Sequence, residues 1–360
     1  MLHAMVMAGG GGTRFWPRSR TARPKQFLRM TGERTLLQLA FDRLEGCALP
    51  PERCWIITGK AYLDETRVQL PDLPSSHVVG EPVGRDTAPC VALGAALIAR
   101  TDPEAVILVT PADHVIEPVQ EFRRAVNVAA QMAEENPEAL ITFGIPPTYA
   151  SVGYGYIHRG ERLTTHQGIG VFRVAKFEEK PPLERAERFF ASGEYFWNAG
   201  IFVWKARAIL DAIKANRPTL YEAALRVADV WDTPGREEVL AKEYPTMDKI
   251  SIDYAVLEKH PRVLAVQAPY RWDDVGSWLA LERMQPQDTS GNTVQGTHVG
   301  LNTSGCVIVG QPDRLIATIG VKDLLIVQDG ECVLVAHRSE EATVKEMVHE
   351  LRKRGLERHL

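Results

Sequence analysis

The segment Val6–Phe27 reads V-M-A-G-G-G-G-T-R-F-W-P-R-S-R-T-A-R-P-K-Q-F, and it is more informative about function than the rest of the chain. An apolar run from Leu2 to Ala8 overlaps its start and predicts a buried strand. Four glycines (9–12) follow, and then Thr13 and a series of arginines that ends at Lys25. Glycines let backbone N–H groups approach a bulky anion, and basic side chains supply charge to a polyphosphate. The alternative is a glycine-rich turn with incidental surface arginines.

Two common phosphate-binding motifs do not fit this segment. The P-loop pattern G-x-x-x-x-G-K-[ST] needs Gly-Lys-Ser/Thr, which does not occur near these glycines. In the dinucleotide fingerprint G-x-G-x-x-G, Arg14 or Phe15 falls where the third glycine should be. The segment therefore handles phosphate in another way.

The composition is that of an ordinary globular enzyme. The 360 residues are 45% hydrophobic and 24% charged, with a net charge of −4, which argues against nucleic acid as the main partner. Five scattered cysteines without C-x-x-C spacing favour neither a disulfide framework nor a zinc site, and we expect a cytoplasmic location. No apolar run approaches 18 residues, so we expect no membrane span. The chain reaches the glycines within nine residues, which predicts no signal peptide.

Apolar runs alternate with helical periodicity over the first two thirds of the chain. This pattern predicts an α/β, Rossmann-like domain with a mixed, mostly parallel sheet. Beyond about Gln285, short strand-like pieces recur at turn-rich intervals and are followed by a helical segment from Glu341 to about Arg354. We therefore expect a catalytic domain over residues 1–285. Residues 286–360 should form a small C-terminal β unit, a short left-handed β-helix-like structure, with a terminal helix.

Acidic residues stand where ligands bind in such sheets, beyond the carboxyl ends of strands. Asp113 follows a predicted buried strand over residues 105–109, which suits a carboxylate that holds Mg²⁺ against phosphate oxygens. An Asx-turn or a helix cap is the alternative. Asp273 and Asp274 lie between Trp272 and Trp278, where a solvated acidic turn is equally possible.

The whole glycine-rich segment resembles the signature G-G-x-G-T-R-[LF]-W-P-x-S-x-x-x-x-P-K-[QP]-[FL] of the sugar-1-phosphate nucleotidyltransferases. Trp16-Pro17 and Lys25-Gln26-Phe27 look like the mannose-1-phosphate guanylyltransferase branch of this family. The resemblance covers about residues 5 to 280 and continues more weakly to the end. It implies a transfer of GMP from GTP to α-D-mannose 1-phosphate, giving GDP-mannose and pyrophosphate by Mg²⁺-assisted in-line attack. It also implies a homodimer.

The resemblance also assigns catalytic roles. Asp113 lies in a segment that is similar to the family's metal-binding P-A-D-H-x-I, and Asp274 is the second metal carboxylate of W-x-D-V-G-S-W. Arg14 and Lys25 would hold the leaving pyrophosphate. Backbone groups of the glycine segment would cradle the nucleotide, through Gly9, Gly10, Gly12 and Thr13.

Three further segments resemble the family's sugar-phosphate site. Phe177–Pro181 matches F-x-E-K-P, in which Lys180 would hold the sugar phosphate and Glu179 would accept hydrogen bonds from hydroxyls. G-Y-G-Y-I contributes Gly153 and Tyr154, and W-N-A-G-I-F contributes Asn198 and Gly200. The alternatives are a charged strand end and ordinary core aromatics. Asp253, in S-I-D-Y-A, is a substrate contact or a helix cap, and we favour the cap.

The choice of nucleotide rests on E-P-V-G-R-D-T-A-P, residues 81–89, which resembles the family's E-P-x-G-R-N-T-A-P. Glu81 could accept hydrogen bonds from guanine or ribose, and Asp86 and Thr87 complete the nucleotide contacts. Asp86 replaces the usual Asn and so lacks an NH₂ donor.

Two other functions stay open. One is a uridylyl- or thymidylyltransferase that acts on glucose 1-phosphate, and the other is a catalytically inactive nucleotide-binding relative. The length leads us to expect no additional isomerase domain.

Overall fold

The computed structural model describes residues 1–10, 12–47 and 49–360, and these form two compact units. Unit 1 comprises Met1–Gly9, Ala40–Ala112 and Ile116–Trp272. Unit 2 comprises Gly10–Leu39, Asp113–Val115 and Asp273–Leu360. The chain therefore passes from one unit to the other inside three of the predicted motifs, directly before Gly10, Asp113 and Asp273.

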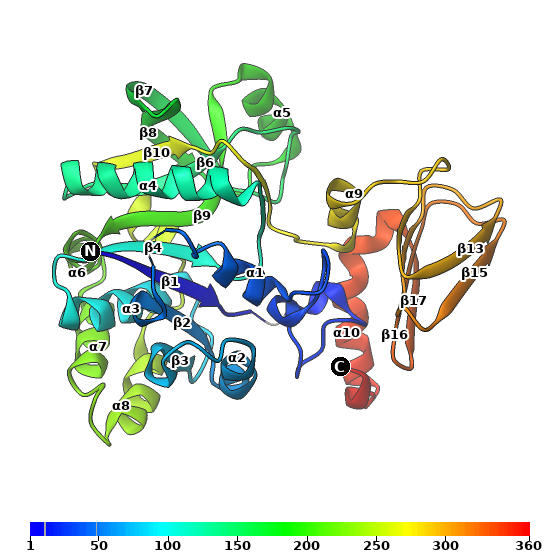
Figure 1. Ribbon diagram of the computed structural model, residues 1–360, viewed down its shortest axis with the longest axis horizontal. Helices are drawn as coiled ribbons and strands as arrows, with labels where there is room; N and C mark the ends of the chain where they lie inside the picture. The colour runs from blue at the N-terminus through cyan, green and yellow to red at the C-terminus, as the bar shows by residue number, and fades with distance from the viewer. Residues whose placement is uncertain (11, 48) are drawn as a thin grey trace. The chain divides into compact units, whose positions relative to one another are not determined.

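A mixed sheet forms the centre of unit 1 (Figure 1). Among the described residues it has nine strands in the order β3-β2-β1-β4-β9-β6-β10-β8-β7. The strands are β1 (Leu2–Ala8), β2 (Cys54–Gly59), β3 (Val78–Glu81), β4 (Val106–Pro111), β6 (Leu140–Ile145), β7 (Tyr156–His166), β8 (Ile169–Glu178), β9 (Tyr195–Lys205) and β10 (Val263–Gln267). β1, β2, β3 and β4 are parallel, whereas β9 runs antiparallel to β4 and β6. The predicted mixed α/β fold is confirmed.

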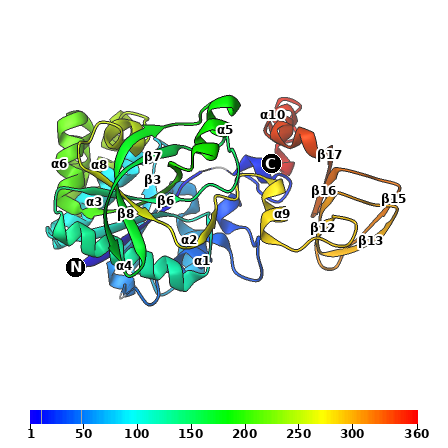
Figure 2. The ribbon, with the colours of Figure 1, turned by 90° about the horizontal axis from the view of Figure 1, so that it is seen from above.

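Helices cover both faces of this sheet. Seen from above, α4 lies on one side and α6 and α8 lie on the other (Figure 2). Phe122, Val126, Ala129 and Ala133 of α4 are buried, which is the helical spacing that the sequence shows. The helices are α1 (Leu36–Asp42), α2 (Leu63–Gln69), α3 (Thr87–Thr101), α4 (Val119–Glu135), α5 (Leu183–Ser192), α6 (Ala206–Asn216), α7 (Pro218–Asp229) and α8 (Arg236–Glu243).

Helix α3 is buried along almost its whole length, from Ala88 to Ile98. A Cβ atom at Gly94 would collide with Sδ of Met5 on β1. Glycine is therefore required where α3 packs closely against the strand that leads into the glycine-rich segment.

Unit 2 joins the signature segment to the C-terminal strands through one hydrophobic core. Phe15, Trp16, Leu28 and Trp278 pack with apolar residues of the strands, such as Val307. Its elements are α9 (Leu281–Met284), β12 (Thr293–Gln295), β13 (Thr297–Leu301), β14 (Val307–Val309), β15 (Leu315–Ile319), β16 (Leu324–Asp329), β17 (Cys332–His337) and α10 (Val344–Lys353). A separate two-stranded sheet pairs β5 (Val115–Glu117) with β11 (Arg271–Asp273).

The C-terminal strands stack as expected of a β-helix-like structure. β12, β14 and β16 pair in parallel in one sheet, and β13 pairs in parallel with β15 in another. The left-handed sense of this stack stays a prediction. None of the helices in the described ranges combines the length and the apolar character that a membrane span requires.

Candidate active site

Lys25 brings two of the predicted acidic residues together in unit 2. It begins a short 3₁₀ helix, Lys25–Phe27, and its side chain is buried. Its ammonium group donates to Oδ2 of Asp113 at 2.8 Å and to the backbone oxygen of Asp274 at 2.5 Å. One cation therefore contacts both residues, which are 161 positions apart in the sequence.

The carboxylate of Asp113 is held in its ionised form. Burial alone would raise its pKa, but Lys25 and His114 together hold the pKa below its ordinary value. Oδ1 of Asp274 accepts a hydrogen bond from the backbone N–H of Gly276 at 3.1 Å. The Asp113 carboxylate and the backbone of the Asp274 turn meet at one ammonium, and carboxylate oxygens are the hard donors that Mg²⁺ prefers.

Asp273 differs from its neighbour Asp274. Its carboxylate forms an ion pair with Arg283, and its Oδ1 accepts from the backbone N–H of Val275 at 2.7 Å. Asp273 therefore stabilises the turn.

The glycine-rich segment depends on positive φ angles, with Gly10 at φ 112° and Gly12 at φ 55°. A Cβ atom at Gly12 would lie 2.5 Å from the backbone nitrogen of Lys25, so only glycine lets this turn lie against Lys25. Thr13 begins a 3₁₀ helix and Arg14 is exposed to solvent. Gly11, which belongs to the predicted cradle, lies outside the described residues.

The later arginines of the signature bind protein groups instead of standing free for phosphate. Arg18 donates to Oε1 of Gln295 at 2.8 Å and to the backbone oxygen of Gly310 at 3.2 Å. Arg23 donates to Oδ2 of Asp329 at 2.8 Å. These residues fasten the signature segment to the C-terminal strands of unit 2, a structural role that the sequence did not predict.

The predicted nucleotide residues of the segment 81–89 lie near the carboxyl edge of the parallel strands in unit 1. Glu81 is the last residue of β3, and its Oε1 accepts a hydrogen bond from the hydroxyl of Tyr244. Burial raises the pKa of Glu81 to about 7, while the Tyr244 hydrogen bond opposes the shift. A Cβ atom at Gly9 would lie 3.4 Å from Oε2 of Glu81, so the carboxylate lies directly beside the end of β1.

Asp86 and Thr87 organise the start of α3. Asp86 has a φ of 67°, and its side chain accepts a hydrogen bond from the backbone N–H of Thr87 at 2.7 Å. Thr87 Oγ1 accepts from the backbone N–H of Ile252 at 2.9 Å. A cap needs an acceptor, so the replacement of Asn by Asp leaves this contact intact.

Asn198 lies at the same edge of the sheet, since it pairs with Gly144 near the carboxyl end of β6. Its Oδ1 accepts from the backbone N–H of Gly200 at 3.2 Å and from Thr142 Oγ1 at 3.1 Å. Its Nδ2 donates to Oδ1 of Asp253 at 2.7 Å. Three protein contacts therefore fix the orientation of the amide.

The predicted role of Asp253 as a helix cap is wrong. Ile252 precedes a π-helical turn, Asp253–Leu257, and the side chain that accepts a hydrogen bond from this turn is that of Ser251, from the backbone N–H of Tyr254 at 3.3 Å. Burial raises the pKa of Asp253 to about 6; the Asn198 hydrogen bond opposes the shift and the negative charge of Glu179 adds to it. Only the family-like pattern around Asp253 could have indicated this site, because 55 positions separate it from Asn198.

The other predicted sugar-phosphate residues also lie in unit 1. Lys180, at φ 43°, forms an ion pair of 2.8 Å with Oε1 of Glu179. Oε2 of Glu179 lies 2.5 Å from where a Cβ atom of Gly155 would be, so the carboxylate lies over a glycine. The Tyr154 ring contacts Trp197 and Trp272, each with centroids 5.0 Å apart. Gly153 donates its N–H to Ser151 Oγ at 3.2 Å.

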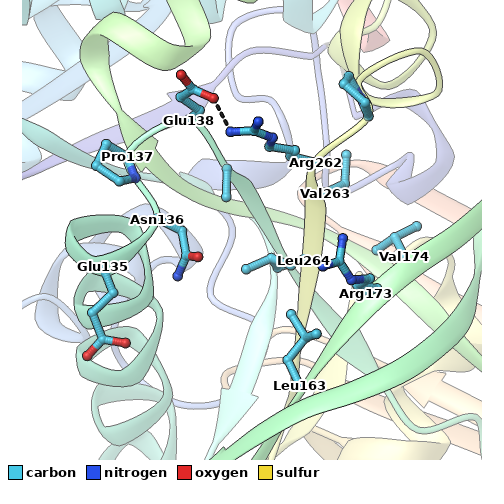
Figure 3. A pocket seen from close by; sticks show the side chains of 12 residues that line it. Glu135, Asn136, Pro137, Glu138, Leu163, Arg173, Val174, Arg262, Val263 and Leu264 are labelled. Atoms are coloured by element: carbon cyan, nitrogen blue, oxygen red, sulfur yellow. Dashed lines mark hydrogen bonds and ion pairs between the residues drawn. The ribbon is translucent and has the colours of Figure 1, made fainter.

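A hollow of about 470 Å³ opens at the other edge of the sheet (Figure 3). It lies beside the residues that precede the parallel strands β6 and β10, where Glu138 and Arg262 form an ion pair. Ligands of open α/β sheets bind beyond the carboxyl ends of strands, so this hollow is not the candidate active site.

Two family models match the chain in succession. "Nucleotidyl transferase" matches residues 3–291, and "MannoseP isomerase/GMP-like beta-helix domain" matches residues 296–351. The fold and the acidic cluster with its glycine-rich turn thus define a nucleotidyl transferase that carries a β-helix domain.

Relatives that align with nearly the whole chain indicate the family within this class. The mannose-1-phosphate guanylyltransferase of Escherichia coli K12 is 38% identical over 99% of this chain and 75% of its own length. The enzyme of that name from Klebsiella pneumoniae is 37% identical over 98% of this chain and 74% of its own length. A crystal structure from Thermus thermophilus, titled mannose-1-phosphate geranyltransferase, is similar with a TM-score of 0.86 and 34% identity, covering 98% of this chain and 99% of that one. The chain belongs to the mannose-1-phosphate guanylyltransferase family.

Proposed function

We propose that this chain transfers GMP from GTP to α-D-mannose 1-phosphate and releases GDP-mannose and pyrophosphate. The observation that carries the proposal is the cluster in which one buried lysine, Lys25, contacts both Asp113 and Asp274. Relatives named for this activity, which align with nearly the whole chain, support it.

The reaction needs little covalent chemistry from the protein. A sugar phosphate oxygen is already anionic near neutral pH, so no general base is required. The obstacle is the repulsion between two anions, which positioning and positive charge overcome.

Nucleotidyl transferases of this family typically use a divalent metal, and we propose Mg²⁺ on Asp113 and Asp274. The donor chemistry fits, because Lys25 holds the Asp113 carboxylate close to the backbone oxygen of Asp274, and Mg²⁺ prefers one or two carboxylates together with phosphate oxygens. When bound, Mg²⁺ supplies charge neutralisation to the phosphates. Lys25 and the exposed Arg14 would hold the leaving pyrophosphate by their own charge.

The remaining roles divide between the two substrates. For GTP we propose backbone contacts from Gly9, Gly10, Gly12 and Thr13, with Glu81, Asp86 and Thr87 near the nucleoside. For the sugar phosphate we propose that Lys180 binds the phosphate and that Glu179 and Asn198 bind hydroxyls. Gly153, Tyr154 and Gly200 would shape the hexose contacts. The ion pair between Lys180 and Oε1 of Glu179 supports this assignment, since it holds the proposed phosphate-binding and hydroxyl-binding groups side by side.

We also propose a homodimer. In the pairing of β13 with β15, Val299, Leu301, Leu315 and Ile319 lie on one face, and each is more than half exposed. An apolar sheet face of this kind is typical of a protein interface. For the domain boundary we propose a position near residue 285, close to where the two family matches meet. The odd number and scattered spacing of the cysteines favour the cytoplasm as the location.

A grid of substrates tests the function. Pyrophosphate release is measured with GTP, UTP and dTTP, each combined with mannose 1-phosphate and glucose 1-phosphate. We expect GTP with mannose 1-phosphate to give the highest kcat/KM. A preference for UTP or dTTP with glucose 1-phosphate would establish the first alternative, and no turnover in any combination would establish the inactive relative.

A further inference from the structure

The segment Tyr244–Ile252 is hydrogen-bonded to residues 81–88, which contain the predicted nucleotide-binding residues Glu81, Asp86 and Thr87. Both segments belong to unit 1. Four hydrogen bonds join them: Tyr244 hydroxyl to Glu81, Arg85 to the backbone oxygen of Pro245, Ala88 N–H to the oxygen of Ile250 (3.1 Å), and Ile252 N–H to Thr87 Oγ1 (2.9 Å). Ala88 takes part through its backbone, whereas Arg85, Thr87 and Glu81 take part through their side chains. The bond from Tyr244 is the one that involves the carboxylate assigned to guanine or ribose.

The contact between Tyr244 and Glu81 is enclosed. Tyr244 is fully buried and Glu81 is only 8% exposed. The hydroxyl of tyrosine has one hydrogen, which it donates to Oε1, and a carboxylate offers about four lone-pair sites over its two oxygens. Oε2, which lies on the side of Gly9, and the second lone pair of Oε1 therefore stay available to a ligand.

We propose that Tyr244 is a positioning residue that orients the Glu81 carboxylate to read the guanine base of GTP. The inference rests on the proposed function, which places Glu81 at the nucleoside. Guanine presents two adjacent donors, N1–H and the 2-amino group, and the two oxygens of one carboxylate match them. Uracil and thymine present a single N–H donor on the corresponding edge, so a fixed carboxylate favours guanine.

The hydrogen bond from Tyr244 also keeps Glu81 able to accept the two hydrogen bonds from guanine. The groups that face the pair are the hydroxyl of Tyr244, the buried thiol of Cys90 and the guanidinium of Arg85. Loss of the hydroxyl removes a hydrogen bond that stabilises the carboxylate, so more of Glu81 would be protonated near neutral pH. A protonated carboxyl has a donor where guanine needs an acceptor.

The test uses the full chain with Tyr244→Phe, and Tyr270→Phe as a matched control. Tyr270 is also buried in unit 1, and its hydroxyl has no hydrogen-bond partner among the described residues. Initial rates are measured with GTP and with ITP, which lacks the 2-amino group, at saturating mannose 1-phosphate between pH 6.5 and 8.5. We expect Tyr244→Phe to raise KM for GTP about tenfold and to leave kcat within about twofold. The preference for GTP over ITP should fall, and the loss should be larger at pH 6.5 than at pH 8.5. Tyr270→Phe should match the wild type.

An unchanged KM and an unchanged GTP-to-ITP ratio in folded Tyr244→Phe would overturn the inference, while leaving guanylyl transfer intact. Failure of the wild type to use GTP would overturn the proposed function instead. If Tyr244→Phe does not fold, the Glu81→Gln variant provides the test. A preference for GTP over ITP equal to that of the wild type would show that Glu81 does not read the base, and so would contradict the role of the Glu81–Tyr244 pair. In the double variant Tyr244→Phe/Glu81→Gln, we expect no further rise in KM beyond that of Glu81→Gln.

Discussion

At the scale of single residues, Lys25 is the centre of the account. Its ammonium group, buried beneath the glycine-rich turn, contacts Asp113 and the backbone of Asp274. Before substrate binds, this cation offsets the charge of Asp113. In the proposed mechanism, the same ammonium would bind phosphate oxygens once a polyphosphate and a metal ion are present.

Replacement of Lys25 by Met should lower kcat by roughly 10²–10³, the loss typical of removing one electrostatic contact to a transition state. Pyrophosphate release at saturating GTP and mannose 1-phosphate measures this. Lys345→Met is the control, since Lys345 is an exposed lysine of the same unit. A Lys25→Met rate within threefold of the wild type would remove Lys25 from the catalytic machinery.

Glu81 predicts a pH dependence of stability. Its folded pKa of about 7 lies above its ordinary value of 4.5, so the folded state binds more protons than the unfolded state between these values. The free energy of unfolding should therefore fall as the pH rises from 4.5 to 7, by about 3 kcal/mol in total, and level off above pH 7. Glu81→Gln removes this titration, so urea unfolding midpoints of the two proteins should diverge between pH 5 and 8. Parallel curves would show that Glu81 is not buried as described.

The residues of the site could be named from the sequence, but not placed. Arg14, Lys25, Asp113 and Asp274 lie in motifs that can be recognised in the sequence. The spacing of these motifs does not show that the ammonium of Lys25 contacts both Asp113 and Asp274. The Glu81–Tyr244 hydrogen bond links positions 163 apart and follows no local pattern. Such contacts arise from the topology of the sheet.

At the scale of elements, the glycine-rich turn depends on two glycines for different reasons. Gly10 has a φ of 112° with open space where a Cβ atom would be, whereas a Cβ atom at Gly12 would press on the backbone of Lys25. Gly10→Ala should therefore cost only backbone strain, about 1–2 kcal/mol. Gly12→Ala takes a left-handed conformation at φ 55° and in addition displaces Lys25.

The two variants form a matched pair. We expect Gly12→Ala to lower kcat at least about tenfold more than Gly10→Ala does, because small displacements of a catalytic group are costly. Steady-state kinetics and thermal unfolding of both proteins check this. Equal losses in the two variants would mean that the close approach of Gly12 to Lys25 has no catalytic consequence.

Most elements of the fold follow from periodicity, and the exceptions have physical causes. The strands predicted over residues 2–8 and 105–109 and the helix predicted from Glu341 to about Arg354 lie within a few residues of β1, β4 and α10, because their apolar spacing is regular. α7 and α8 were not predicted. Only Arg217 separates α7 from α6, and Pro218 at its start resembles a helix breaker although it fits the first turn. α8 is mostly charged and buries only Leu240.

At the scale of the whole molecule, the family and the fold class predicted from the motifs are confirmed. The sequence did not predict that the signature segment belongs to unit 2. This segment shares a core with the C-terminal strands, hundreds of residues away. Motif spacing reports chain order and carries no information on which segments share a core.

The proposed homodimer predicts that a single surface substitution changes the oligomeric state of the protein. Ile319→Lys places a charge on the apolar face of β13 and β15 and should shift the protein from twice the chain mass toward the monomer in light scattering. Val68→Lys is the control, because Val68 has the same 74% exposure in unit 1. A wild type that is monomeric at micromolar concentration would contradict the dimer, and a dimer that survives Ile319→Lys would place its interface elsewhere.

We propose that a divalent ion on Asp113 and Asp274 lets two phosphoryl groups meet. This proposal is tested most directly by the rate of GDP-mannose formation in the wild type and in Asp274→Ala, each with Mg²⁺ and with excess chelator. We predict that the chelator abolishes the wild-type reaction and that Asp274→Ala is slower by roughly 10²–10³ with Mg²⁺ present. Full activity of Asp274→Ala, or wild-type activity that persists with the chelator, would contradict the account.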